Sequence, residues 1–198
     1  MKNKSILILF SIYMCLPALL SADDVLDAIN EGTDFYKNSN YIEAANSLEY
    51  AAQLAREKVS QQLGGFFPKA PNGWEMGEPE FQSAGASLFG GGNTAEVSYS
   101  KGEESVTITI AANSPALQSF MMLANNSAFL TASGKKMDRF AGQKAIVEFD
   151  EENMSGNINV IVAGTALVTI DGSGTKLETL KSFAGSVAYK ELIAMLMQ

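Results

Sequence analysis

This chain contains few of the side chains that act as activated nucleophiles or bind catalytic metal ions. The sequence contains no histidine, and its single cysteine, Cys15, lies in an apolar leader. Most activated nucleophiles and most zinc or copper sites depend on one of these two side chains. A serine–lysine pair remains conceivable, but Lys101, Lys135, Lys136 and Lys144 lie in or near predicted polar turns, where lysine stays solvated and protonated.

One stretch matches a cofactor-binding pattern in a loose form. Gly90-Gly91-Gly92-Asn93-Thr94-Ala95 fits Gly-x-Gly-x-x-Ala. The dinucleotide motif needs a strand before it and a helix after it, because the helix N-terminus must face the pyrophosphate. Here a strand pattern over residues 96–99 follows instead. We therefore expect a hairpin loop at this point and no cofactor.

Two acidic stretches are candidates for metal or catalytic sites. Asp150-Glu151-Glu152-Asn153 and Asp171-Gly172-Ser173-Gly174 both lack the alternating carboxylates and late glutamate of a calcium loop. We expect solvated turns and no metal site. Glycoside hydrolysis needs only two carboxylates in a cleft, so a carboxylate-dependent hydrolase acting on an envelope glycan is the alternative to a protein without enzymatic activity.

The first 22 residues have the pattern of an export signal. Lys2 and Lys4 precede an almost wholly apolar run over residues 6–20, and the small residue Ala22 precedes two aspartates. A basic start, a short apolar stretch and a small residue before the cut are typical of a cleavable signal peptide. The run is short for a membrane span. We expect export to the periplasm, with a retained leader that anchors the protein in the inner membrane as the alternative.

The charge balance limits the classes of partner. The chain carries a formal net charge of −8 and has no basic stripe. Nucleic acids and anionic lipids are bound through cationic contacts. We therefore expect no nucleic-acid partner, and no stable membrane insertion once the signal is cleaved.

The residues after the leader predict a pair of helices. Leu26, Ile29, Thr33 and Tyr36 recur at three- and four-residue steps and give the first helix one apolar face. A second helix is expected over residues 41–60. Two helices joined by so short a turn pack antiparallel.

This pair resembles a tetratricopeptide (TPR) helical hairpin. The small and aromatic packing positions of that repeat are matched by Gly32, Phe35, Tyr41, Ala44, Leu48 and Ala51. The chain has no second copy, and a single repeat cannot bury its own face. The resemblance implies that the hairpin docks on the rest of the chain or on a partner, with Phe35 and Tyr41 among the contact residues.

A linker is expected over residues 64–73, where glycines and prolines break helix and favour turns. Phe66, Phe67 and Trp74 add large apolar surface there. We expect these aromatics either to dock the hairpin against the main domain or to line a pocket for a partner or a small ligand.

From Trp74 onward, the pattern predicts strands and helices in one α+β domain. Alternation at Val106, Ile108 and Ile110 favours a hairpin with the strand before it. A helix is expected to begin at Ser114-Pro115 and to end at Gly134. Tight turns between strands make them antiparallel. The later elements are expected to be strands over 136–140, 143–149, 157–163 and 166–170, a helix around 177–184 and a short helix over 189–197.

The order of these elements, the early Gly73-Trp74 and the closing Tyr-Lys-Glu-Leu helix resemble the PsbP-like fold over residues 66–198. That fold occurs in a photosystem II extrinsic subunit and in bacterial periplasmic proteins. The resemblance implies an accessory, partner-binding role without shared catalytic residues. The expected organisation is a signal over 1–22, a hairpin over 23–63, a linker over 64–73 and a PsbP-like domain over 74–198. The expected function is that of a non-enzymatic accessory or binding protein of the envelope, acting through protein or small-ligand contacts.

Overall fold

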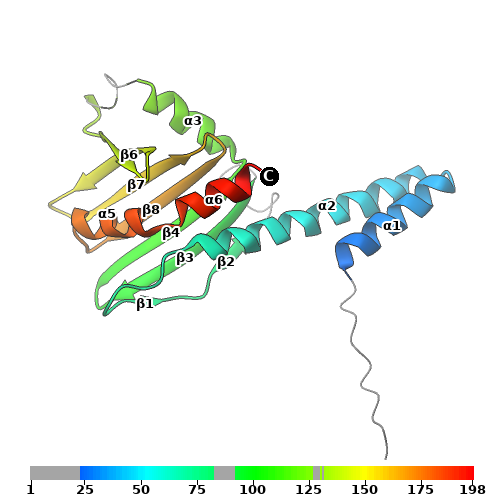
Figure 1. Ribbon diagram of the computed structural model, residues 1–198, viewed down its shortest axis with the longest axis horizontal. Helices are drawn as coiled ribbons and strands as arrows, with labels where there is room; N and C mark the ends of the chain where they lie inside the picture. The colour runs from blue at the N-terminus through cyan, green and yellow to red at the C-terminus, as the bar shows by residue number, and fades with distance from the viewer. Residues whose placement is uncertain (1–22, 83–91, 127–129, 131) are drawn as a thin grey trace, which may run out of the picture.

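The computed structural model describes residues 23–82, 92–126, 130 and 132–198, so the predicted signal and Gly90-Gly91 lie outside the described residues. The described chain has the predicted α+β class. An antiparallel sheet carries helices, and an N-terminal helical hairpin projects away from it (Figure 1).

The hairpin consists of α1 (Asp24–Lys37) and α2 (Tyr41–Leu63), which pack against each other. Asp23 caps α1 by accepting a hydrogen bond from the backbone N–H of Val25. Close approach of the helices depends on small residues. A Cβ at Gly32 would lie 2.8 Å from Cγ of Leu48, so only glycine fits there without a shift. The predicted antiparallel helix pair is confirmed.

The α2 helix runs three residues past its expected end, because its last turn is held by the sheet domain. Leu63 is fully buried in the core, and the Ser60 hydroxyl donates a 2.9 Å hydrogen bond to the carbonyl oxygen of Gln82. The 3-10 turn η1 (Gly64–Phe66) follows without a break.

Within the described residues, eight strands form the sheet. Their order is β1-β3-β4-β8-β7-β6-β5, and β2 also pairs with β3. Every pairing is antiparallel. The strands are β1 (Glu75–Met76), β2 (Glu80–Gln82), β3 (Asn93–Lys101), β4 (Glu104–Ala112), β5 (Lys136–Phe140), β6 (Gln143–Asp150), β7 (Ser155–Val162) and β8 (Ala166–Ser173).

The core lies on one face of the sheet, under α5 (Leu177–Ser186) and α6 (Tyr189–Leu196). Valine, isoleucine and alanine alternate along the central strands and bury one side, where they meet Leu180, Phe183 and Leu192. The α3 helix (Pro115–Ala124) lies over the other face, near β6 and β7 (Figure 1). Within the described ranges, no helix is both long enough and apolar enough to cross a bilayer.

Two sequence predictions in this domain were wrong. The helix expected to continue to Gly134 ends at Ala124. Just beyond this end, the backbone N–H of Asn126 donates a hydrogen bond to the carbonyl oxygen of Leu123. Asparagine side chains compete for backbone hydrogen bonds and favour helix ends. The turn expected at residues 171–174 begins later, because β8 continues through Ser173 and pairs there with β4.

The short strands β1 and β2 were not predicted. Strands of two and three residues carry no detectable period. Both strands pair with β3. The β1 strand pairs with Tyr99 and Ser100, and β2 pairs with Thr94–Glu96. Together they cover most of the edge of β3 that would otherwise be open.

Candidate ligand-binding site

The sheet face opposite α5 and α6 is polar. Strand registers place cross-strand neighbours in rows on this face. A half-solvated antiparallel sheet commonly alternates in this way, with one face in the core and one face polar. One row consists of Ser98, Thr107, Asp171, Asn157 and Glu148, and the next consists of Glu96, Thr109, Thr169, Asn159 and Ile146.

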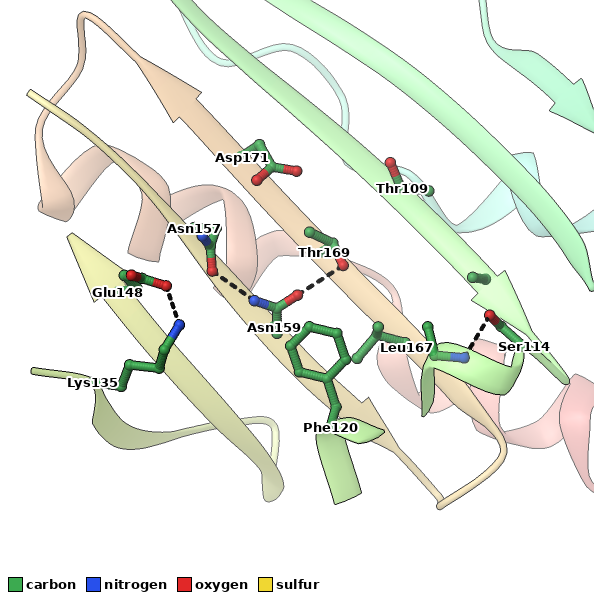
Figure 2. A pocket seen from close by; sticks show the side chains of 12 residues that line it. Thr109, Ser114, Phe120, Lys135, Glu148, Asn157, Asn159, Leu167, Thr169 and Asp171 are labelled. Carbon is green, nitrogen blue, oxygen red and sulfur yellow. Dashed lines mark hydrogen bonds and ion pairs between the residues drawn. The ribbon is translucent and has the colours of Figure 1, made fainter. Parts of the chain in front are cut away.

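A pocket of about 280 Å³ lies between this face and α3 (Figure 2). Its walls come from β4, β6, β7, β8, α3 and the turn before β5. One end is apolar, and the other end presents hydroxyl, amide and carboxyl groups. The apolar end is formed by Ala111, Ala116, Phe120 and Leu167, and the polar end by Thr109, Asn157, Asn159, Thr169 and Asp171.

A chain of hydrogen bonds fixes the floor of the polar end. The hydroxyl of Thr169 donates to Oδ1 of Asn159 at 2.9 Å, and Nδ2 of Asn159 donates to Oδ1 of Asn157 at 2.6 Å (Figure 2). Asn159 is only 5% exposed, so both ends of its amide must be paired. The network holds Asn157 and Thr169 in defined orientations without a ligand.

Asp171 lies at the polar end of the pocket and is exposed to solvent, and the pKa of its carboxyl is nevertheless shifted. Partial burial among the strands raises the pKa of its carboxyl above its usual value, and the negative charge of Glu96 raises it further. Within the described chain no group donates a hydrogen bond to this carboxylate. Asp150 is the contrast: hydrogen bonds from the Asn153 side chain and from backbone N–H groups lower its pKa.

An ion pair closes the side of the pocket near β6. Nζ of Lys135 contacts a carboxylate oxygen of Glu148, and both side chains line the pocket (Figure 2). These two charges offset each other. Asp171 has no cationic partner in the part of the chain that the structure describes. Glu96 adds a second negative charge behind Thr109, whose hydroxyl donates a 3.0 Å hydrogen bond to the Glu96 carboxylate.

The aromatic residues singled out in the sequence lie elsewhere. Phe66, Phe67 and Trp74 are half-buried and pack against the core, with the Trp74 ring 5.1 Å from that of Phe183. This is the docking arrangement that we expected as one of two possibilities. Their role in binding a partner stays a prediction, and none of the three lines the pocket under α3.

The other two predicted contact residues belong to the hairpin. Phe35 is half-buried in α1, and Tyr41 is exposed at the start of α2. The Tyr41 ring meets Tyr36 edge-on at 5.5 Å, so the two helices share one exposed aromatic surface at their connected ends. The structure therefore separates the five predicted residues into two groups, one on the core and one on the hairpin.

The acidic stretch at residues 150–153 forms a turn between β6 and β7, as predicted. Oδ1 of Asp150 accepts hydrogen bonds from the backbone N–H groups of Glu152 and Asn153. Across the parts of the chain that the structure describes, no three or more Asp, Glu, His or Cys side chains are grouped to hold a metal ion.

Comparison with known proteins assigns no family. No family description matches the sequence, and no curated protein matches it. Among solved structures, the chain is similar to one described as "Crystal structure of MucB in complex with MucA(peri)", with 12% sequence identity and a TM-score of 0.33. The match covers 62% of this chain and 35% of that chain. A likeness this weak carries no conclusion about function, and membership of the PsbP-like fold stays a prediction.

Proposed function

We propose that this protein is an exported, non-enzymatic binding protein of the cell envelope, and that its ligand site is the pocket under α3. The observation that carries the proposal is the fixed amide and hydroxyl network beside the exposed Asp171 carboxylate, which accepts no hydrogen bond from the described residues. Export rests on the leader pattern at residues 1–22.

The composition of the pocket supports binding over a purely structural role. Burying a polar group is unfavourable unless it is hydrogen-bonded. The buried Asn159 amide is paired with Asn157 and Thr169, which fixes the orientation of these two partly exposed side chains. Small-molecule sites combine an apolar wall with a few oriented polar groups. Phe120 and Leu167 provide the wall, and Asn157 and Asp171 lie at the polar end.

A carboxylate-dependent hydrolase is the second candidate, because Asp171 and Glu148 line the same pocket. A carboxyl group with a raised pKa suits a general acid. Lys135, however, holds Glu148 in an ion pair, which weakens it as the second catalytic group. We place this candidate below a binding function.

Contact with a protein partner is proposed for the hairpin. The hairpin exposes several large hydrophobic side chains, among them Leu26, Ile29, Tyr36, Tyr41 and Leu48. Ile29 and Tyr36 recur at helical spacing on α1, and the contact of Tyr36 with Tyr41 joins that face to α2. The aromatic groups at Phe66, Phe67 and Trp74 fix the base of the hairpin on the sheet domain.

Recovery of the protein from its own cell envelope tests the proposed function. The full chain is expressed with its leader, and a native mass spectrum is recorded. We expect a mass that begins near Asp23 with a bound small molecule, and loss of that molecule in Phe120→Ala. Met122→Ala, on the same helix but exposed to solvent and outside the pocket lining, is the matched control and should keep the molecule.

Three outcomes would overturn parts of the proposal. An intact Met1 in the membrane fraction would overturn the cleaved signal. Equal ligand retention in Phe120→Ala and the wild type would overturn the pocket as the site. Hydrolysis of an envelope glycan by the pure protein, abolished in Asp171→Asn, would replace the binding function with the second candidate.

A further inference from the structure

We infer that the pocket under α3 selects an ammonium or guanidinium group attached to an apolar body of about the size of a phenyl ring. This inference rests on the proposed binding function and names the ligand class of the same site. It follows from the directions of the hydrogen bonds at the polar end, from the charge there and from the apolar wall.

The hydroxyl oxygens of the two threonines at the polar end can accept hydrogen bonds from a ligand but cannot donate any. A threonine hydroxyl has one proton to donate and two lone pairs. Thr109 donates its proton to Glu96 at 3.0 Å, and Thr169 donates its proton to Asn159 at 2.9 Å. Both oxygens therefore keep lone pairs for a ligand but have no proton to give.

These acceptors lie close together on neighbouring strands. Thr109 of β4 and Thr169 of β8 are direct cross-strand partners, and Asp171 is the next residue along β8 that points to the same face (Figure 2). Directly opposed residues have Cβ atoms about 5 Å apart. A single nitrogen that carries several N–H groups can meet acceptors at this spacing, and an ammonium has three donors.

The charge at this end favours a cation over an anion or a neutral group. Asp171 forms no ion pair with any of the described residues, and Glu96 lies beside it closely enough to raise the pKa of its carboxyl further. Lys135, the lysine among the described residues that line the pocket, forms an ion pair with Glu148. A carboxylate ligand would meet two like charges, whereas an ammonium would form a charge-assisted hydrogen bond with Asp171. The side-chain amide of Asn157 is the remaining donor of the polar end.

The opposite wall sets the size of the ligand. Phe120 and Leu167 face the cavity with Ala111 and Ala116. The cavity has a volume of about 280 Å³. An aromatic ring with a two-carbon chain and an amine fits this volume. The same groups are found in a free arylalkylamine and at the N-terminus of a peptide that begins with phenylalanine.

Phenethylamine is the probe that tests the inference, measured by isothermal titration calorimetry on the full mature chain. 3-Phenylpropionate has the same ring and chain but a carboxylate, and Phe-Gly-Gly-amide presents the amine on a peptide. We expect saturable binding of phenethylamine or the peptide, at least about tenfold tighter than binding of 3-phenylpropionate. The tighter of the two amines identifies the source as a free amine or a peptide.

Variants assign the binding to this site. Asp171→Asn and Thr109→Val should each weaken amine binding at least about fivefold, while Ser98→Ala, on the same face but two strands away from Asp171, should leave it unchanged. Circular dichroism spectra of all variants check that they are folded.

Preference for 3-phenylpropionate, or amine binding that survives Asp171→Asn unchanged, would overturn the inference. If a molecule recovered with the protein is lost in Phe120→Ala but is not an amine, the binding function stands and the ligand class is wrong. If no probe binds and no molecule is recovered, the proposed function fails as well.

Discussion

The hydroxyl of Tyr99 donates a 2.6 Å hydrogen bond to the backbone carbonyl oxygen of Pro68. Burial raises the pKa of Tyr99 to about 12, so the group stays a protonated donor at neutral pH. The same ring packs on Phe183 at 4.8 Å. The segment after α2 is therefore fastened to the central sheet, and the direction of the hairpin is set by core contacts.

Removal of this hydroxyl tests the attachment. Tyr99→Phe should lower the free energy of unfolding by about 1–2 kcal/mol, because the buried carbonyl oxygen of Pro68 loses its donor. Tyr189→Phe is the matched control, since the Tyr189 hydroxyl is buried without a hydrogen-bond partner among the described residues. We expect that variant to be neutral or stabilised in urea denaturation. Equal losses in the two variants would contradict the role assigned to the Tyr99 bond.

Position 172 should not accept a side chain larger than that of glycine, although Gly172 has an ordinary strand conformation. A Cβ there would collide with Leu180 and lie 2.9 Å from Cγ2 of Thr175, so Gly172→Ala should displace α5 and cost about 1–3 kcal/mol. Gly185 in α5 meets nothing within 4 Å, and Gly185→Ala should stabilise the helix by about 0.5–1 kcal/mol. Thermal unfolding of both variants measures the contrast, and a stable Gly172→Ala would contradict this packing.

Asp171 is predicted to reduce stability at neutral pH. Its pKa is raised in the folded state, so the folded chain holds this proton more tightly than the unfolded chain does. Stability therefore falls as the pH rises from the unfolded pKa, about 3.9, through the folded value, and the loss is complete above it.

Asp171→Asn should therefore have a higher melting temperature than the wild type at pH 7. The difference should shrink as the pH falls and vanish below about pH 4, where the aspartate is protonated in both states. Melting curves of both proteins from pH 3 to pH 8 give the result. A variant that is less stable at pH 7 would show that the carboxylate has a stabilising partner.

The exposed face of the hairpin is predicted to matter for association and little for folding. Tyr36→Ser together with Tyr41→Ser should abolish recovery of a protein partner by crosslinking in the envelope. The two tyrosines are 65% and 61% exposed, so the free energy of unfolding should change by less than about 1 kcal/mol.

Tyr50→Ser is the control for the hairpin surface. Tyr50 is also exposed on α2, but residues two apart on a helix do not share a face, so it lies on a different side from Leu48. Crosslinks should persist in this variant. If all associations survive the double change at Tyr36 and Tyr41, this surface is not the contact.

Local patterns in the sequence were enough for the helical hairpin and most of the sheet. The period of two at Val106–Ile110 marks the buried side of β4, whereas the 3.6-residue period after Asp23 predicted the helix but marked its exposed side, since the buried residues of α1 are Ala28 and Gly32. The class and the antiparallel pairing followed, because short turns leave neighbouring strands no other arrangement.

The tertiary structure alone decided the pocket. Asp171 was predicted to lie in a turn, because Gly172 and Gly174 favour one. In the structure β8 pairs with β4 and β7 at this point, and this pairing places Asp171 on the sheet face. The alternation of Asn157 with Asn159, and of Thr169 with Asp171, was the signal that could have been used.

The sequence by itself determined the residue types, the leader pattern, the acidic charge and the periods of individual elements. Only the fold decided that Thr109 opposes Thr169, that both donate their protons away from the cavity, and that Asp171 lies beside them. The physical reason is register. A strand pattern fixes which residues share a face, but the partner strand and its alignment are fixed by the whole sheet.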